Sequence, residues 1–158
     1  MPLHSAGILL YRVAGAAREV FLVHPGGPFW ARKDEGAWSV PKGLVDPEED
    51  QLAAARREFQ EETGFAVSGA FIDLGTFRQP GGKRLRVWSH EGDCVAADLK
   101  SNLFEMEWPR GSGRRRSFPE VDRGSWFRRD EALAKIVKGQ RPMLESFFDH
   151  LQAPGQAR

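Results

Sequence analysis

Three glutamates at helical spacing are the feature that most constrains this chain. Glu58, Glu61 and Glu62 stand at positions i, i+3 and i+4, so a helix would place their carboxylates on one face. Like charges at this spacing destabilise a bare helix, so the face must lie in open solvent or be neutralised by cations. Because ligands that are all oxygen select hard ions, the pattern favours Mg²⁺, with Mn²⁺ as the alternative, and leaves coordination positions for water and phosphate.

The residues around this cluster predict the helix that carries it. Asp46 can cap the first turn together with Glu49, Pro47 suits the first helical position, and Gly64 supplies the stop. The side of the helix opposite the glutamates offers three apolar residues for burial against a sheet: Leu52, Ala55 and Phe59. Such packing would hold the carboxylates in place.

Segments rich in apolar residues predict strands before and after this helix. They cover residues 5–13, 19–24, 38–40, 70–78, 83–90, 104–108 and 125–127. Residues 25–36 and 109–117, which are rich in Gly, Pro or Arg, predict loops. Two further helices are expected over residues 130–137 and 141–151. The second has an apolar stripe that predicts docking onto the core, formed by Met143, Leu144, Phe147, Phe148 and Leu151.

Composition limits the classes of protein to which the chain can belong. A length of 158 residues suits one domain, which we expect over residues 1–153, followed by a disordered tail at 154–158. Cys94 is the only cysteine, so no disulfide can form within the chain and a reducing compartment is expected. Lys and Arg total 23 against 22 Asp and Glu, and this near-neutral charge argues against a general nucleic-acid coat.

Targeting patterns are missing from the sequence. We find no signal-peptide pattern and no apolar stretch long enough to cross a membrane. We therefore expect a cytoplasmic protein, a monomer or a homodimer, with no membrane partner and no stable nucleic-acid partner.

Residues 43–65 form a motif of nine positions at fixed spacing. The motif reads Gly, five residues, Glu, seven residues, then Arg-Glu-apolar-any-Glu-Glu-any-Gly-apolar. Its positions are filled by Gly43, Glu49, Arg57, Glu58, Phe59, Glu61, Glu62, Gly64 and Phe65. The segment resembles the Nudix box at every specified position, and chance agreement is on the order of one in 10⁹ per window. The resemblance to Nudix hydrolases implies an α/β/α sandwich with a mixed central sheet, in which the box forms a loop-helix-loop.

The resemblance also implies a metal site. In Nudix hydrolases the last three glutamates of the box bind divalent metal, often with a backbone carbonyl beside the first glycine. The matching glutamates are Glu58, Glu61 and Glu62, and the carbonyl would belong to Lys42 or Gly43. Arg57 would pair with Glu49 or Glu61 and orient the cluster without reacting.

The implied reaction is the hydrolysis of a phosphoanhydride bond inside a nucleoside diphosphate linked to another moiety. Metal ions would neutralise phosphate charge and lower the pKa of a bound water, and a carboxylate would take the proton. The position of this base varies across the family. Glu58 and Glu61 are the first candidates, and Glu107 and Glu120 are the candidates outside the box.

The sequence that precedes the box bears on the substrate. Residues 38–43, Trp-Ser-Val-Pro-Lys-Gly, and the acidic turn after them resemble the asymmetric diadenosine tetraphosphate hydrolases most. A dinucleoside polyphosphate is therefore the expected substrate. A MutT-like nucleoside triphosphate pyrophosphohydrolase is the alternative enzyme, and a Nudix ligand sensor is the non-catalytic one. Such sensors usually lose box glutamates, whereas this chain has lost none.

A polyphosphate chain needs cations beyond the metal. Lys42, Arg84 and Arg86 are the candidates, and the arginine run at 114–116 is either a phosphate clamp or a solvated loop. A nucleobase needs an aromatic platform, for which each of four tryptophans is either the platform or part of the core: Trp30, Trp88, Trp108 and Trp126. We expect residues 25–36 and 109–120 to select the substrate.

Overall fold

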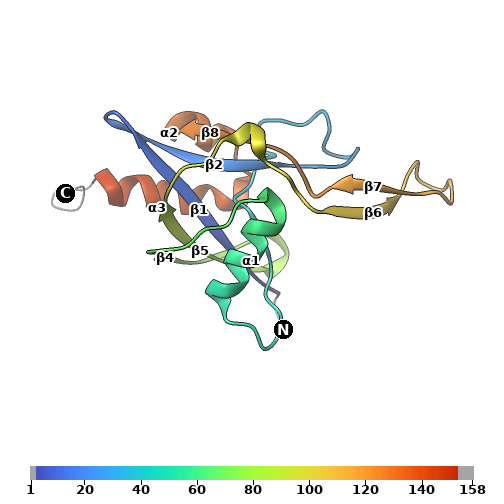
Figure 1. The fold of residues 1–158 in the computed structure, drawn as a ribbon, viewed down its shortest axis with the longest axis horizontal. Coiled ribbons are helices and arrows are strands. Elements are labelled where there is room, and N and C mark those ends of the chain that lie inside the picture. The colour runs from blue at the N-terminus through green and yellow to red at the C-terminus, as the bar shows by residue number, and fades with distance from the viewer. Residues whose placement is uncertain (1–2, 153–158) are drawn as a thin grey trace.

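A computed structural model describes residues 3–152, with side chains up to Asp149. Its strands are β1 (His4–Ala14), β2 (Ala17–Pro25), β3 (Lys42–Leu44), β4 (Ile72–Arg78), β5 (Arg84–Glu91), β6 (Leu103–Glu107), β7 (Arg115–Pro119) and β8 (Val121–Arg128). Its helices are α1 (Gln51–Thr63), α2 (Arg129–Lys135) and α3 (Arg141–Gln152), with short 3₁₀ turns at Pro80–Gly82, Ala96–Asp98 and Lys138–Gln140. Figure 1 shows these elements in order along the chain.

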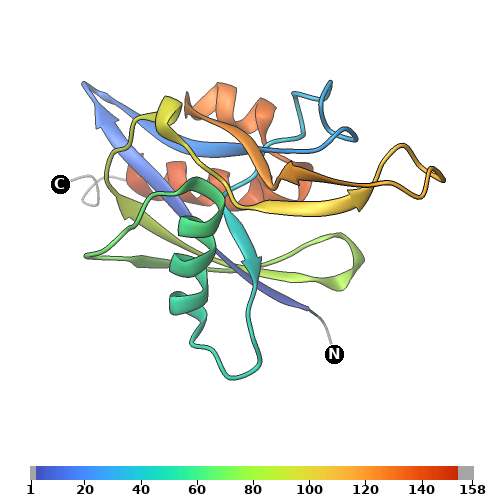
Figure 2. The same cartoon turned by 45° about the vertical axis from the view of Figure 1, so that its right-hand side comes forward.

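The main sheet is mixed and runs β4-β5-β1-β2-β8, with β3 also paired to β1. Strands β1 and β5 are parallel, whereas β1 with β2, β2 with β8, and β4 with β5 are antiparallel. Strands β6 and β7 form a separate antiparallel hairpin that projects from the body (Figures 1 and 2).

One edge of β1 is shared by two partners. The end of β1 pairs with β2 from Tyr11 to Ala14, and its beginning pairs with β3 from Ser5 to Gly7. Between these stretches β1 and β2 diverge, and the chain leading into β3 fills the gap, where Ser39 bridges to Val23. The divergence brings β3 to the centre of the sheet, directly under α1.

Helices cover both faces of the sheet, which confirms the expected α/β/α sandwich. Helix α1 lies on one face, and α2 and α3 lie on the other (Figure 2). Alternate residues of β1 point to opposite faces, so Ile8 packs in the cluster with α1 while Leu9 packs in the cluster with α3. The α3 stripe is buried over its described members, Met143, Leu144, Phe147 and Phe148.

Helix α1 is anchored by its apolar side. Ala54, Ala55 and Phe59 are buried against the sheet. Full burial of a side chain such as that of Phe59 contributes roughly 1.5–3 kcal/mol to the stability of the fold. Gly64 ends the helix with φ of +81°, a left-handed conformation that glycine adopts without steric cost, and its N–H donates to the Gln60 carbonyl. The predicted stop is therefore confirmed.

The predicted start of this helix was wrong by one turn. Asp50 is the cap, and its carboxylate accepts from the Ala53 N–H at 3.0 Å. Asp46 instead closes a turn with Glu49, because its N–H donates to the Glu49 carboxylate and its carbonyl accepts from the Glu49 N–H. Only the Glu49 half of a capping box is present, because the Glu49 N–H bonds to the Asp46 backbone carbonyl instead of its side chain.

Two other elements differ from the sequence predictions. The strand expected over residues 38–40 is reduced to isolated bridges, and the regular strand is β3, shortly after it. The loop expected over 109–117 ends at Arg115, where β7 begins and pairs back onto β6. The predicted tail at 154–158 and the Leu151 side chain lie outside the described part. No helix in the described range 3–152 is long and apolar enough to cross a membrane.

Candidate active site

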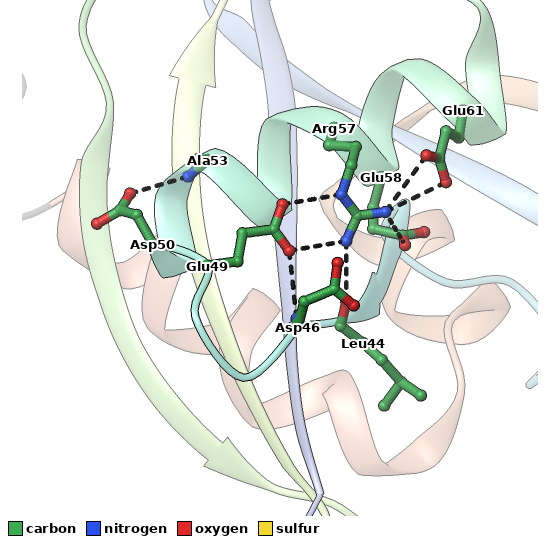
Figure 3. A network of polar contacts seen from close by, with 8 residues as sticks. All are labelled: Leu44, Asp46, Glu49, Asp50, Ala53, Arg57, Glu58 and Glu61. Carbon is green, nitrogen blue, oxygen red and sulfur yellow. Dashed lines mark hydrogen bonds and ion pairs between the residues drawn. The ribbon is translucent and has the colours of Figure 1, made fainter.

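Arg57 is the centre of a polar network at the start of the box (Figure 3). Its Nε and Nη2 donate to both oxygens of Glu49, at 2.9 and 3.0 Å. Its Nη1 donates to Glu58 at 2.8 Å and lies 3.3 Å from Glu61. Its Nη2 also donates to the Leu44 carbonyl at 3.1 Å. The bond to Glu49, followed by those to Glu58 and Glu61, raises the pKa of Arg57, so the side chain is a fixed cation that positions its neighbours.

Gly43 gives the Glu58 carboxylate its space. A Cβ on Gly43 would lie 2.0 Å from Cδ of Glu58 and 2.1 Å from its Oε1. The side chain of Glu58 is only 14% exposed, because it lies between β3 and the Arg57 guanidinium. The glycine of the box is therefore required by a close approach of the carboxylate to the backbone.

Glu62 is a half-buried carboxylate beside β3. Its Oε1 accepts from the Lys42 N–H at 3.2 Å. Burial raises the pKa of Glu62 to about 8. The negative charges of Glu58 and Glu120 also raise this pKa, whereas the positive charge of Lys42 lowers it. Burial also raises the pKa of Glu58, and the charges of Glu61 and Glu120 act in the same direction. The carboxylates are crowded, which is an environment that a cation would stabilise.

Glu120, predicted from outside the box, joins this cluster. It lies between β7 and β8, where its N–H donates to the Asn102 carbonyl and its own carbonyl accepts from Gly26. Its charge raises the pKa of both Glu58 and Glu62. The β7–β8 junction thus brings a fourth carboxylate to the box.

Glu107 is not brought to the cluster. It ends β6 at the far end of the hairpin, where its carboxylate accepts from the N–H groups of Gly111 and Gly113 at 3.1 and 2.8 Å. The predicted alternation along β6 is present, since Glu105 and Glu107 are exposed while Phe104 is half-buried.

A cavity of about 740 Å³ opens beside the cluster. Its acidic wall includes Glu62 and Glu120, and its cations are Lys42, Lys83 and Arg84. Arg86 does not line this cavity, because it forms an ion pair with Asp73 and donates to Gln51 at 3.0 Å. Lys83 could not be predicted from the sequence, because it belongs to no motif, and only its place in the cavity next to Arg84 identifies it.

The donor set of the site fits a hard divalent cation. Within residues 3–152, no three His, Cys, Asp or Glu side chains converge tightly enough to form a ready-made metal site. Glu61 is partly exposed and turned to Arg57. Mg²⁺ is usually held by one or two carboxylates, with water and phosphate completing its shell. Glu58 and Glu62 could supply those carboxylates.

Comparison with known proteins identifies the family. The NUDIX domain family model matches residues 1–147. An 8-oxo-(d)GTP phosphatase of Mycolicibacterium smegmatis is 30% identical over 154 residues, which cover 90% of this chain and 40% of that protein. The chain thus spans about two fifths of this relative. An RNA pyrophosphohydrolase of Dinoroseobacter shibae is 25% identical over 132 residues, covering 72% of this chain and 73% of that one.

The solved structures agree with the fold. A C. elegans Ap4A hydrolase binary complex superposes with a TM-score of 0.67 at 22% identity, covering 94% of this chain and 97% of that one. At this identity the likeness speaks for the fold alone, and the family rests on the match over residues 1–147. The chain belongs to the NUDIX domain family, as its box indicated.

Proposed function

We propose that this protein hydrolyses a phosphoanhydride bond in a nucleoside diphosphate linked to another moiety, with Mg²⁺ or Mn²⁺ as its cofactor. One observation carries the proposal: Glu62 and Glu120, whose charges crowd with that of Glu58, line a cavity that is also lined by cations. Carboxylates that need a cation, next to basic groups that fit phosphate, suit a metal-dependent reaction on a polyphosphate.

The residues of the box would hold the metal. Glu58 and Glu62 are the main ligands in this proposal, Glu61 is available from the same helix face, and the Lys42 or Gly43 carbonyl is the candidate backbone ligand. When bound, the ion neutralises phosphate charge and acidifies water. Arg57 would fix Glu58 through the bond at 2.8 Å.

The cations of the cavity would bind the phosphates. Lys42, Lys83 and Arg84 line the same space as Glu62, so they can contact phosphate oxygens that the metal does not reach. Arg86, held by Asp73, would position α1 through Gln51 without touching substrate.

Glu120 is our choice for the proton acceptor. Within the described residues its carboxylate accepts no hydrogen bond from protein, whereas Arg57 holds the carboxylates of Glu58 and Glu61. Glu120 also lines the cavity and is half-buried. A base must be free to take a proton within reach of the substrate, and Glu120 meets this condition better than Glu107, at the end of β6.

We favour a dinucleoside polyphosphate as the substrate, because the Pro-Lys-Gly sequence that leads into the box resembles that of the asymmetric diadenosine tetraphosphate hydrolases. A nucleoside triphosphate is the second candidate, and the M. smegmatis relative, named as an 8-oxo-(d)GTP phosphatase, supports it.

Product analysis tests the function and separates these substrates. With Mg²⁺, diadenosine tetraphosphate should give ATP and AMP, whereas a MutT-like enzyme should release pyrophosphate from a nucleoside triphosphate. The measurement is chromatography of the products, with ADP-ribose and diphosphoinositol phosphates included in the panel. If the folded protein cleaves none of these compounds but binds one of them, the proposed hydrolase would be wrong and the protein would be a ligand sensor.

Glu120→Gln should lower kcat by about 10²- to 10⁴-fold, because the variant keeps the shape of the side chain but cannot accept the proton. Glu48→Gln is the matched control, since Glu48 belongs to the same box and is exposed. Steady-state kinetics of both variants decide the point. A Glu120→Gln enzyme with a kcat like that of Glu48→Gln would assign the base to another carboxylate.

Gly43→Ala should lower activity by about 100-fold, because the new methyl group displaces the Glu58 carboxylate and misplacement of a ligand by about 1 Å has such an effect. Since the far end of a flexible side chain can move aside, the midpoint of thermal unfolding should change little. Activity and thermal unfolding are measured on one preparation. Full activity would show that the position of Glu58 is not critical.

Glu62→Gln should stabilise the metal-free protein at pH 8 by about 1–3 kcal/mol, but not at pH 4. As the pH rises from the ordinary carboxyl pKa to the raised pKa of about 8, the unfolded wild type releases the Glu62 proton while the folded one keeps it. Stability is therefore lost with rising pH, and the amide avoids that loss. Added Mg²⁺ should stabilise the wild type more than the variant.

Chemical unfolding at both pH values, with and without Mg²⁺, makes this measurement, and Glu48→Gln is again the control. Equal stabilisation of wild type and Glu62→Gln by Mg²⁺ would remove Glu62 from the set of proposed ligands.

A further inference from the structure

A second cavity lies far from the box, at the other end of β2. It has a volume of about 540 Å³ and opens where the β1–β2 turn meets the junction of β8 and α2. Three of the residues that line it are arginines, namely Arg18, Arg128 and Arg129. We call it the arginine cavity.

The arginine cavity is separate from the cavity beside the box. Among the described residues, none lines both spaces. Strand β2 runs from one to the other, since its first residue, Ala17, lines the arginine cavity and its last, Pro25, lines the cavity beside the box. A strand of this length spans roughly 25–30 Å. Figures 1 and 2 accordingly show the β1–β2 turn at the opposite end of the molecule from the β6–β7 hairpin.

The start of β2 makes room for the cavity. Alternate residues of a strand point to opposite faces, so Arg18 shares a face with Val20, which packs in the core cluster with α3. On this face the buried Phe148 of α3 forms part of the wall. Ala16 and Ala17 have only methyl side chains, so the space between the turn and α3 stays open.

Arg18 is a cation without a protein partner in the described part of the chain. Its Nε is buried and has no hydrogen-bond partner there. Arg18 also takes part in none of the ion pairs that residues 3–149 form. Buried donors without an acceptor are rare in folded proteins. Because the Nε is enclosed while the side chain lines the cavity, the terminal Nη groups are the atoms that meet a ligand.

The other two arginines are only loosely paired. The Nε of Arg128 lies 3.8 Å from Glu19, and the Arg128 side chain is 68% exposed. The guanidinium of Arg129 lies 3.3 Å from Asp130 and 3.9 Å from Asp149, and its side chain is 40% exposed. Exposed ion pairs contribute little stability, so both arginines can turn to a ligand at small cost.

Two carboxylates also line the arginine cavity, those of Asp130 and Glu131. Both residues are exposed, whereas Arg18 is half-buried. Water screens exposed charges more strongly than buried ones, so the positive charge of Arg18 has the greater effect inside the cavity. The wall carries three guanidiniums against two carboxylates, and it therefore favours an anion.

We propose that the arginine cavity binds a small molecule through an oxyanion, which is a phosphate or a carboxylate, at a site separate from the box. A guanidinium presents planar N–H donors that match two oxygens of either group. The apolar part of the wall, formed by Ala16, Ala17 and Phe148, receives the body of the molecule. A volume of about 540 Å³ is in the range of small-molecule sites. The site requires no metal and does not rest on the proposed function.

NMR titration of the ¹⁵N-labelled full chain tests the proposal. The probes are inorganic phosphate and malonate, with sodium chloride at matched ionic strength as the reference, and a chelator keeps metal out of the box. At least one probe should shift the Arg18 Nε–H signal and the amide signals of Ala16 and Ala17, with saturation at a Kd on the order of 1 mM. Sodium chloride should not. A response to phosphate alone assigns a phosphate ester, and a response to malonate alone assigns a carboxylate.

Three variants locate the binding. Arg18→Gln should weaken the affinity for the bound probe about 10- to 100-fold, because a charged donor pair is lost. Arg129→Gln should weaken it as well, and this partly exposed position keeps the test valid if Arg18→Gln disturbs the turn. Arg141→Gln is the matched control, since Arg141 is exposed and lines neither cavity. It should bind like the wild type.

The outcomes separate this inference from the proposed function. If neither probe gives saturable shifts at Ala16 and Ala17, or if Arg18→Gln and Arg129→Gln bind as tightly as Arg141→Gln, the arginine cavity is not an anion site, even in an active hydrolase. If saturable binding depends on Arg18 and Arg129 while no phosphoanhydride is cleaved, the arginine cavity remains an anion site and only the proposed function is wrong.

Discussion

The site depends on one guanidinium. Arg57 contacts the turn before α1 through Glu49, the helix through Glu58 and Glu61, and β3 through the Leu44 carbonyl. A planar cation with five donors can bind three carboxylates and a carbonyl at once, which a lysine could not do. The result is that the turn, α1 and β3 are held together in one geometry.

The divergence of β1 and β2 supplies the room for that geometry. Because β2 leaves β1 after Val20, the edge of β1 is open to β3, and β3 carries Lys42 and Gly43 to the glutamates of α1. Phe59 fixes the helix from below. A fully paired β1–β2 hairpin would close this gap and leave the carboxylates over a flat sheet.

Features that depend on local pattern could be predicted from the sequence. The helix, its Gly64 stop and the β4–β5 hairpin follow from periodicity and turn residues. The start of α1 was misplaced because Asp46 and Glu49 satisfy each other in a turn, which leaves Asp50 to cap the helix. Asp46 and Asp50 are both suited to cap the helix, and the path of the backbone decides between them, which the sequence spacing does not show.

Features made by distant segments could not be predicted. His24 has the appearance of an ordinary polar residue in sequence, yet it is buried and binds Asp122, 98 residues away. The sequence did not show that Trp30 lines the cavity beside the box, whereas Trp126 packs against Phe21 with the two rings tilted. The alternation of β6 was visible, but the direction in which its hairpin projects was not.

The β6–β7 hairpin has a consequence for how such a protein can change over evolutionary time. Its tip, residues 108–114, lies beyond the paired strands, so insertions there would alter the length of the hairpin without altering the pairing of β6 with β7. Insertion of one residue within β6 would instead exchange the two faces of the strand. Glu105 would then point towards the loop after β2, and Phe104 would point towards solvent. The tip is therefore free to diverge in length, while the strands tolerate changes only in steps of two residues.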